Sequence, residues 1–589
     1  MSIRKGVIVT PSLKYIVSLL KKYMNPYLPQ VMLLAVLLLI LSGIDILNPQ
    51  IIRYYIEAVN EPVLNTRLIL IASIVYIIVN LIHRVLFVII RWISQNLAWS
   101  TTNDLRIDLT RHCINLDMKF HNQRKTGEMI ERIDGDASTL SEFFSTFIIH
   151  FLGSFLLLAG ILIAVFIESW IYGLIFLGFT IIALIALYLV RKVASPLWKK
   201  VRESTTALFG VIEENISGFE DIRANGADEF LMRRFHESAQ TDFRNKSKAM
   251  IVSRVYYAVN ILMGALLNIG ILVASYFLAD RLGIDGGVLF LLLSYGNNIL
   301  RPLRLILWQL EQMQNSLANI DRIKEWFDIK SEITDEGNLL FPDEDINLEF
   351  DTLDFGYSEE LFLKNINFNI EPGKKLGLVG RTGSGKTTIA RLIFRLYDPN
   401  NGKIKINGLN SKKFPLSELR KNVAYVTQEV ELFKASIKDN ITFFDYDMTD
   451  EQVLRVLEDL GLKKWYDQLP KGLETVIFSE DLGLSAGEEQ LLALTRAFLK
   501  NPKLVILDEA SSRLDPATEK QVDLALEKLL EGRSAIIIAH RLATLQKVDD
   551  ILILEKGEIV EYGSRAELVK NPNSHFSKLL QQGIQEVLT

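Results

Sequence analysis

The sequence has little cysteine and no excess of basic charge. Its single cysteine, Cys113, cannot form a disulfide within the chain or build a cysteine cluster for a metal ion, so folding needs no oxidising compartment. The 65 lysines and arginines against 70 aspartates and glutamates give a net charge of −5. Proteins that bind nucleic acid usually carry a basic excess. Nucleic acid is therefore excluded as the expected partner.

Length and composition exclude a disordered chain and a single small domain. Hydrophobic residues make up 49% and aromatic residues 10% of the chain, which supplies ample apolar surface to bury. The 589 residues also exceed the size of about 250 to 300 residues at which one hydrophobic core stops growing. The long apolar runs are concentrated in the first part of the chain. We therefore expect two halves of different character.

The first half contains six apolar segments of the length that a membrane-spanning helix needs, which is about 20 residues. Buried helices of a soluble core are the alternative, but such helices are usually about 11 to 12 residues long and have a polar face. We therefore expect a transmembrane domain over residues 1–328. The expected spans are residues 27–47, 68–90, 144–167, 170–190, 255–279 and 286–306.

Lysine and arginine residues predict the orientation of these spans, because such residues accumulate in cytoplasmic connections. The connections 91–143 and 191–254 are rich in both residue types, whereas the other connections are short and carry few. Both termini are then cytoplasmic. The two long connections read as helices, so the spans should continue into the cytosol. Turns near 117–127 and 217–226 should touch the domain that follows.

A phosphate-binding loop follows the polar linker 329–345. Residues 380–387 match the pattern G-x-x-x-x-G-K-[ST] between a strand-like run and a helix-like run. In this pattern backbone N–H groups curl around phosphates, the lysine reaches the β and γ oxygens, and the last residue ligates Mg²⁺. We therefore assign residues 346–589 to a nucleotide-binding domain for ATP. Its expected ATP contacts are Gly380, Arg381, Thr382, Gly383, Ser384, Gly385, Lys386, Thr387 and Thr388.

Two further strand-like runs end in residues suited to ATP hydrolysis. The run 503–507 precedes Asp508 and Glu509, and the run 535–539 precedes His540. Asp508 could hold Mg²⁺ through water, and Glu509 could activate the water that attacks the γ-phosphorus. His540 could bridge Glu509 and the γ-phosphate. A surface Asp-Glu pair and an incidental histidine are the alternatives, but the strand context beside a phosphate-binding loop favours catalysis.

These residues, with Leu-Ser-Ala-Gly-Glu at 484–488, resemble the ATP-binding cassette (ABC) exporters. The resemblance covers nearly the whole chain and fits a half-transporter, in which six spans are followed by one ATPase domain. It implies an all-α six-helix transmembrane domain with long cytosolic helical extensions, followed by an α/β P-loop ATPase domain with a RecA-like core and a helical subdomain. It also implies that Tyr357 stacks on adenine, that Gln428 senses Mg²⁺ and water, and that His540 is the switch histidine.

In this family two ATPase domains close head to tail, and each ATP meets one chain's P-loop and the other chain's signature sequence. The resemblance therefore implies a second half-transporter chain as partner, with Ser485 and Gly487 contacting the partner's ATP. Its catalytic residues would be Glu509, His540 and Gln428. Its Mg²⁺ ligands would be Thr387, Gln428 and Asp508.

The signature departs from the family's usual Leu-Ser-Gly-Gly-Gln at two positions. Ala486 adds a Cβ to the phosphate-facing turn, and Glu488 adds a negative charge. Ser485 and Glu488 also match a capping box, in which two side chains satisfy N–H groups at the start of a helix. Those N–H groups would otherwise meet the γ-phosphate. The cap is therefore expected to compete with the ligand.

Two other departures point the same way. Residues 478–481 lack the glycine-flanked acidic pattern that family members often carry, and Arg513 stands where an alanine is usual. Glu509 and His540 are intact. In known heterodimeric exporters, one chain keeps the hydrolytic carboxylate but offers a poor signature. We therefore expect a heterodimer with a non-identical subunit and one fully active site, and a homodimeric exporter and a non-transporting regulator or ATP-gated channel remain alternatives.

Polar residues within the spans indicate the cargo only in outline. Intramembrane charges usually face a cavity or a partner, although long side chains near span ends also snorkel to headgroups. We expect a hydrophobic or amphipathic small molecule, a lipid or a peptide to be moved across the lipid bilayer of a bacterial plasma (inner) membrane. The candidate residues are His83, Arg84, Asn260, Asn268, Asn297, Asn298, Arg301 and Arg304.

Overall fold

The computed structural model describes residues 13–60, 66–138, 151–282, 285–477, 484–508, 516–539 and 545–582. The chain forms two compact units. The first comprises Met1–Ile114 and Thr126–Ile329, and the second comprises Asn115–Lys125 and Lys330–Thr589. A short segment from the middle of the helical half therefore belongs to the same unit as the C-terminal half.

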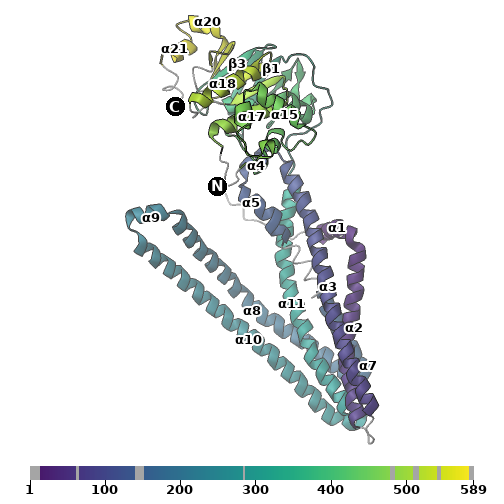
Figure 1. Ribbon diagram of the computed structural model, residues 1–589. Coiled ribbons are helices and arrows are strands. Elements are labelled where there is room, and N and C mark those ends of the chain that lie inside the picture. Colours follow the sequence, from purple (N-terminus) through teal and green to yellow (C-terminus); the bar gives the residue numbers. More distant parts are fainter. Residues whose placement is uncertain are drawn as a thin grey trace. The chain divides into compact units, whose positions relative to one another are not determined.

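The described residues of the first unit form helices, and five of these helices are 33 to 55 residues long (Figure 1). Within the described residues, four stretches are long and apolar enough to cross a membrane: Lys21–Asn60, Thr66–Ile114, Trp170–Ser217 and Asp228–Phe277. The helices of this unit are α1 (Leu13–Met24), η1 (Asn25–Tyr27), α2 (Leu28–Asn60), α3 (Thr66–Ile114), α5 (Thr126–Ile130), the π-helix η2 (Glu131–Asp136), α7 (Gly153–Glu168), α8 (Trp170–Ser217), α9 (Phe219–Asn225), α10 (Asp228–Leu282) and α11 (Gly286–Asp328).

The remaining two predicted spans coincide with α7 and α11. The part of the third predicted span before residue 151 lies outside the described residues, which leaves α7 with 16 residues. Helix α11 covers the sixth predicted span and continues to Asp328. The six-helix transmembrane fold predicted from the sequence is confirmed.

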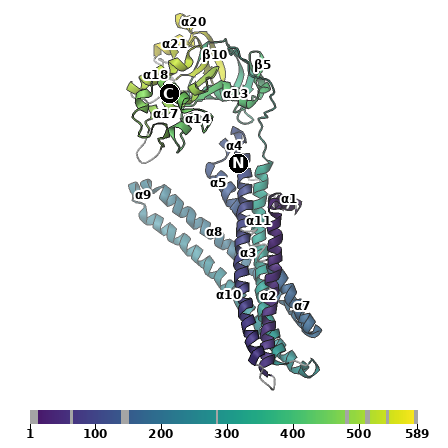
Figure 2. The ribbon, with the colours of Figure 1, turned by 45° about the vertical axis from the view of Figure 1, so that its right-hand side comes forward.

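The spans continue as uninterrupted helices beyond their apolar segments, as predicted. Helix α3 runs to Ile114, past the predicted span end at residue 90. Helices α8 and α10 lie side by side as a long hairpin with α9 at its tip, which both Figure 1 and Figure 2 show. Charged and polar side chains replace the apolar residues along these extensions, because a helix that leaves the hydrocarbon region meets water. The helices of the membrane domain thus extend well beyond their apolar segments.

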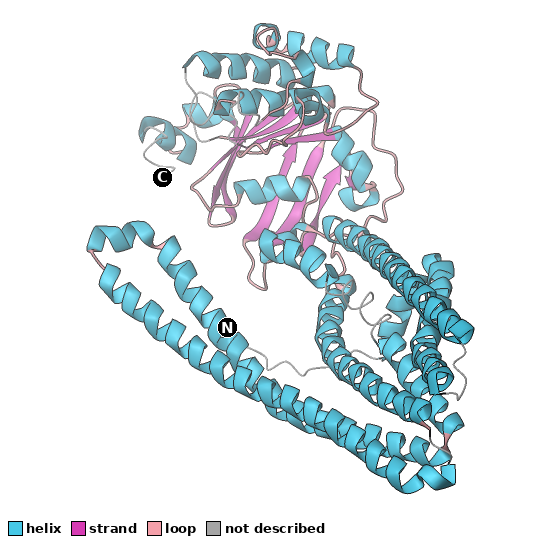
Figure 3. Cartoon of the chain, turned by 60° about the horizontal axis from the view of Figure 1, so that its bottom comes forward, coloured by secondary structure: helices cyan, strands magenta, loops and turns pink. Residues whose placement is uncertain are grey.

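The second unit contains two sheets packed with helices (Figure 3). Within the described residues, one sheet has the strand order β2-β1-β4-β5 and the other β10-β9-β3-β8-β7-β6. The strands are β1 (Leu348–Phe355), β2 (Leu363–Ile370), β3 (Lys375–Val379), β4 (Asn401–Ile406), β5 (Leu409–Asn410), β6 (Val423–Val426), β7 (Leu504–Asp508), β8 (Ser534–Ile538), β9 (Asp550–Glu555) and β10 (Glu558–Ser564).

The second unit also contains helices, most of them short. They are α4 (Met118–Gln123), α12 (Lys386–Ile393), η4 (Ser411–Lys413), α13 (Leu416–Asn422), α14 (Ile437–Thr442), α15 (Asp450–Asp459), α16 (Lys463–Tyr466), η5 (Gly472–Glu474), α17 (Ala486–Leu499), α18 (Pro516–Leu530), α20 (Arg565–Lys570) and α21 (His575–Gln582).

The larger sheet determines where the functional residues gather. Strands β6, β7, β8, β3 and β9 run parallel, and β10 pairs antiparallel with β9 at one edge. Every residue of β7 and β8 is buried, in agreement with their near-continuous apolar sequence. In open parallel sheets, ligands bind beyond the carboxyl ends of the strands. Strands β3, β6, β7 and β8 therefore all end at the same edge of this sheet.

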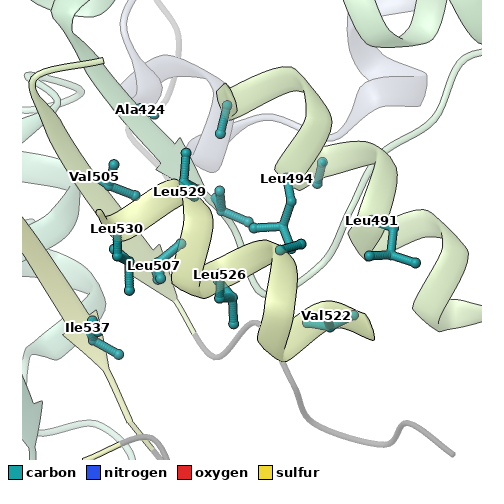
Figure 4. Close-up of a cluster of buried hydrophobic side chains, with 14 of the residues drawn as sticks. Ala424, Leu491, Leu494, Val505, Leu507, Val522, Leu526, Leu529, Leu530 and Ile537 are labelled. Atoms are coloured by element: carbon teal, nitrogen blue, oxygen red, sulfur yellow. The ribbon is translucent and has the colours of Figure 1, made fainter. Parts of the chain in front are cut away.

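The helical part packs onto this sheet through one apolar core (Figure 4). Leu491 and Leu494 of α17 and Leu526 and Leu529 of α18 pack in the same cluster as strand residues such as Leu507. These side chains expose between 0% and 7% of their surface. Burying a leucine contributes about 1.5 to 3 kcal/mol. Helix α17, which begins in the signature sequence, is therefore held firmly against the sheet.

Helix α4 is the segment of the membrane half that belongs to the second unit. Met118 packs against the core of the smaller sheet and its neighbours, and Asn122 Nδ2 donates to Tyr397 Oη at 2.5 Å. Asp117 caps α4 by accepting from Phe120 N at 3.2 Å and also accepts from Glu332 N at 2.6 Å. The predicted contact of this turn with the following domain is confirmed. The turn 217–226 lies in the first unit, so its predicted contact stays a prediction.

Candidate ATP-binding site

The phosphate-binding loop joins the end of β3 to the start of α12. Gly385 precedes α12 with φ of +115°, a region that side chains disfavour. A Cβ built there would also lie 2.4 Å from Leu363 Cδ2, so any larger residue would displace that buried leucine side chain. Gly383 has φ of +82°. The predicted loop is thus formed as a tight turn that ends at a helix N-terminus.

Lys386 is buried in this turn. Its Nζ donates to Gly380 O at 2.6 Å and to Arg381 O at 3.2 Å, so the ammonium group is held over the loop by backbone carbonyls. Ser384 is 4% exposed, and its Oγ is a buried oxygen without a hydrogen-bond partner among the described residues. Buried hydroxyl groups are usually paired. A fixed cation, an unpaired hydroxyl and a positive helix terminus together fit an anionic phosphate group.

The rest of the predicted loop continues this arrangement. Arg381, Thr382 and Gly383 are exposed, whereas Thr388 is buried and Thr387 half-buried in the first turn of α12. The Thr387 hydroxyl lies on the same helix turn as Lys386 and can serve as an oxygen ligand to Mg²⁺.

Asp508 is the last residue of β7 and only 5% exposed. Tyr425 Oη, from the neighbouring strand β6, donates to Asp508 Oδ2 at 3.3 Å. Burial, and secondarily the nearby Asp508 carboxylate, raise the pKa of Tyr425, so its phenol stays a donor. Within the described residues, no cluster of three or more His, Cys, Asp or Glu could hold a metal ion. One carboxylate with a hydroxyl and substrate phosphates is the set that Mg²⁺ commonly uses.

Tyr357 lies beside the phosphate-binding helix, as an adenine-stacking residue should. Its Oη is 3.0 Å from Thr388 Oγ1, and its ring is 38% exposed. The ring meets Phe355 and Tyr397 edge to face, with centroids 4.9 Å and 5.1 Å apart. Burial, followed by the Tyr357 phenol, raises the pKa of Tyr397. The Tyr357 side chain therefore stays partly accessible.

Gln428 follows β6 at the same sheet edge as Asp508, and its side chain is exposed. It lies next to a cavity of about 300 Å³, which is lined by Tyr425, Thr427, Glu429 and Arg496 among others. Glu509 and His540, together with residues 478–481 and Arg513, lie outside the described residues. The strands that lead to Glu509 and His540 are in place as β7 and β8.

The signature sequence lies on a different element, at the start of α17. The predicted capping box is confirmed: Ser485 accepts from Glu488 N, and Glu488 Oε2 accepts from Ser485 N at 2.7 Å and Ser485 Oγ at 2.8 Å. Glu488 Oε1 accepts from Trp465 Nε1 at 2.8 Å. The side chains of Ser485 and Ala486 are exposed, whereas Gly487 is buried. The turn thus presents an exposed surface that is already internally hydrogen-bonded.

A polar cavity of about 160 Å³ lies among the helices of the first unit. His83 Nε2 is 3.0 Å from Asp45 Oδ1, and Arg84 and Arg301 line the same cavity. These residues come from α2, α3 and α11. Arg304, about one turn beyond Arg301, is not part of the lining.

Sequence reasoning missed Tyr425, Trp465 and Asp45. No local pattern distinguishes the two aromatic residues from ordinary core positions. A charged residue at position 45 inside an apolar span was the available signal for Asp45.

Comparison with known proteins agrees with this geometry. Residues 31–303 match the family model "ABC transporter transmembrane region", and residues 363–512 match the model "ABC transporter". The chain is 31% identical to the uncharacterized ABC transporter ATP-binding protein YfiC of Bacillus subtilis (80% of this chain, 79% of the relative). It is 30% identical to an ATP-dependent lipid A-core flippase of Desulfotalea psychrophila (81% and 84%).

The fold is similar to that of a bacterial Atm1-family ABC exporter solved with ATP bound. The TM-score is 0.78 at 22% identity, and the superposition covers 95% of this chain and 99% of the other.

Proposed function

Because the chain belongs to the ABC transporter family and joins a membrane domain to an ATPase domain, we propose that it is one subunit of an ATP-driven exporter for an amphipathic or lipid-like substrate. The observation that carries the proposal is the formed phosphate-binding loop, with buried Lys386 at the start of α12, on the same chain as the apolar helices. Relatives named as lipid A-core flippases support a lipid-like cargo. The movement would run from the cytoplasm or inner leaflet outward.

Each site residue would have a separate role in ATP hydrolysis. Lys386 would hold the β and γ oxygens, and Thr387, Asp508 and Gln428 would hold Mg²⁺, which supplies positive charge to the transferred phosphoryl group. Glu509 would take a proton from the attacking water, and His540 would position Glu509 and the γ-phosphate. Tyr357 would stack on adenine.

We further propose a heterodimer with one fully active site. That site would combine this chain's P-loop and Glu509 with an intact signature from the second chain. The capped signature of this chain supports the proposal, because Ser485 Oγ donates to Glu488 instead of to a ligand. Donors that are already satisfied gain less from a phosphate. The other ATP site, formed by the second chain's P-loop and this chain's signature, would then bind ATP without efficient hydrolysis.

The cavity in the membrane domain is the proposed cargo site. Two guanidinium groups and one carboxylate, the latter paired with His83, give it a net basic character. Charged groups inside a membrane protein usually mark a substrate path. An anionic group on an amphiphile would therefore be recognised there. The placement proposed is a bacterial inner membrane with both termini and the ATPase domain in the cytoplasm.

Transport into inside-out membrane vesicles tests this function. We expect a fluorescent anionic phospholipid analogue to accumulate in the vesicle interior or inner leaflet only with ATP and Mg²⁺, and against its gradient. A vesicle preparation that lacks this chain is the control. Movement that only equalises the two sides would support the channel alternative and reject export.

A further inference from the structure

Both carboxylate oxygens of Glu488 are engaged, and the two sets of partners come from different parts of the domain. Oε2 closes the capping box with Ser485, whereas Oε1 accepts the indole N–H of Trp465 at 2.8 Å. Trp465 lies on α16 and packs against the same apolar core as α17. A residue outside the signature therefore contacts the side chain that makes this signature unusual.

The indole fixes the carboxylate through its one hydrogen bond. Indole N–H is a donor only, and a bond from it to a carboxylate is charge-assisted. Because the Trp465 ring is packed in a core, its N–H cannot follow Glu488 to another rotamer without disturbing that packing. The carboxylate is thereby held where it also occupies the Ser485 hydroxyl.

We propose that Trp465 is a positioning residue for the signature: it holds Glu488 in the capping box and so weakens the contact between this chain's signature and ATP on the second chain. The inference rests on the proposed function, in which each signature faces the other chain's ATP. Without the indole, Glu488 can leave Ser485, and the hydroxyl becomes available to a γ-phosphate oxygen. The effect is confined to the ATP site formed by this chain's signature and the second chain's P-loop. The other ATP site, which contains this chain's P-loop, uses the second chain's signature.

Chain-resolved photolabelling with 8-azido-ATP tests the proposal in the complete exporter in lipid nanodiscs. The label marks the chain whose domain holds the adenine, so labelling of the second chain reports on this chain's signature. Trp465→Phe keeps the aromatic ring and removes the N–H, and Glu488→Ala removes the carboxylate that engages Ser485. A lost hydrogen bond to a charged group corresponds to about tenfold or more in affinity.

We expect Trp465→Phe and Glu488→Ala each to lower the half-saturating nucleotide concentration for the second chain by about tenfold. Labelling of this chain should not change. In the Glu488→Ala background, Trp465→Phe should add little further, because both variants free the same hydroxyl. A purely structural role of Trp465 would give the same effect in both backgrounds. Tyr466→Phe, its neighbour on α16, is the matched control and should change neither chain.

Independent effects of the two substitutions, or an effect of Glu488→Ala with none of Trp465→Phe, would overturn the proposal. If Trp465→Phe lowers the thermal stability of the complex, Glu488→Ala alone still tests whether freeing Ser485 tightens labelling, and no tightening would reject the mechanism. A preparation with one kind of chain would instead reject the heterodimer. In that case the coupling between Trp465 and Glu488 would still be measured from the label summed over both copies. Failure of the heterodimer and failure of the Trp465 proposal are therefore distinguishable.

Discussion

Lys386 is held in place by the phosphate-binding loop itself. Its Nζ lies 2.6 Å from Gly380 O and 3.2 Å from Arg381 O, so the ammonium group is already directed along the loop. Such preorganisation lowers the ordering cost when a phosphate binds. The buried position also strengthens the attraction, because charge–charge interactions are stronger away from bulk water.

Substitution of Lys386 by Ala should weaken ATP binding by about 10- to 100-fold, which is the usual worth of hydrogen bonds to a charged group. Fluorescent trinitrophenyl-ATP titration of the purified complex measures this change. Lys364→Ala, on β2, is the control and should retain affinity. Unchanged binding by the Lys386 variant would show that the loop does not hold the phosphates.

Glu509→Gln should abolish hydrolysis while preserving ATP binding, because an amide cannot take the proton from the attacking water. Loss of a general base usually lowers turnover by about 10² to 10⁴. Phosphate release and retained radiolabelled ATP measure the two properties on one preparation. Hydrolysis at the wild-type rate would show that another group is the base.

At the scale of elements, the π-helix η2 is tied to α11 by a buried carboxylate. Asp136 is 3% exposed and accepts from Arg322 Nη2 at 2.5 Å, from Arg322 Nε at 3.0 Å and from Arg132 Nη1 at 3.0 Å. The bidentate geometry fixes the direction of both helices. Removing one partner of a buried ion pair leaves an uncompensated charge.

Asp136→Ala should therefore destabilise the membrane domain by about 1.5 to 3 kcal/mol, the usual worth of hydrogen bonds to a charged group, because the two arginines that it leaves are partly exposed. The exposed ion pair between Arg234 and Glu214, with Nη2 2.9 Å from Oε2, is the matched comparison. Glu214→Ala should change the free energy of unfolding much less, because exposed ion pairs contribute little. Thermal unfolding in detergent compares the two variants, and an equal decrease in melting temperature would contradict the assigned role of the buried cluster.

The cavity among α2, α3, α7 and α11 provides a second pair of matched positions. Arg301 lines this cavity, whereas Arg304 does not. If the cavity holds an anionic cargo, Arg301→Gln should reduce the ratio of cargo-stimulated to unstimulated ATPase activity to about one, because a charge-assisted contact worth at least tenfold is lost. Arg304→Gln should keep the stimulation. Equal behaviour of the two variants would reject this cavity as the cargo site.

Elements with a strong local pattern were predictable from the sequence. The strand-like run expected directly before the phosphate-binding pattern is β3 (Lys375–Val379), and the one expected at 503–507 is β7 (Leu504–Asp508). Buried parallel strands are short continuous apolar runs, and a helix N-terminus must follow the phosphate-binding pattern. The capping box was predictable for the same reason, since both residues lie within one turn.

Pairings between distant elements were not predictable. Asp45 meets His83 only because α2 and α3 pack with those faces together, and Trp465 meets Glu488 only because α16 and α17 share a core. The direction of a side chain depends on helix rotation and packing, which no short pattern encodes. The roles of Glu509 and His540 stay predictions, because both residues lie outside the described residues.

For the whole molecule, ATP would act by favouring one arrangement of two chains. A ligand shifts such an equilibrium only by its differential affinity for the two states. ATP between a P-loop and a signature would bind the closed state preferentially, and hydrolysis would remove that preference. Helix α4, which lies in the same compact unit as the ATPase domain, would carry the change toward α3 and the membrane domain.

The composition of the native complex tests the central claim most directly. The tagged chain would be extracted from its own membrane in mild detergent, and the mass of the intact complex and of its chains would be measured. We predict one copy of this chain with one different half-transporter chain that carries an intact signature and lacks the catalytic carboxylate. A complex of two copies of this chain would contradict the account, because Ala486 and Glu488 would then face both ATP molecules and would have to be compatible with hydrolysis.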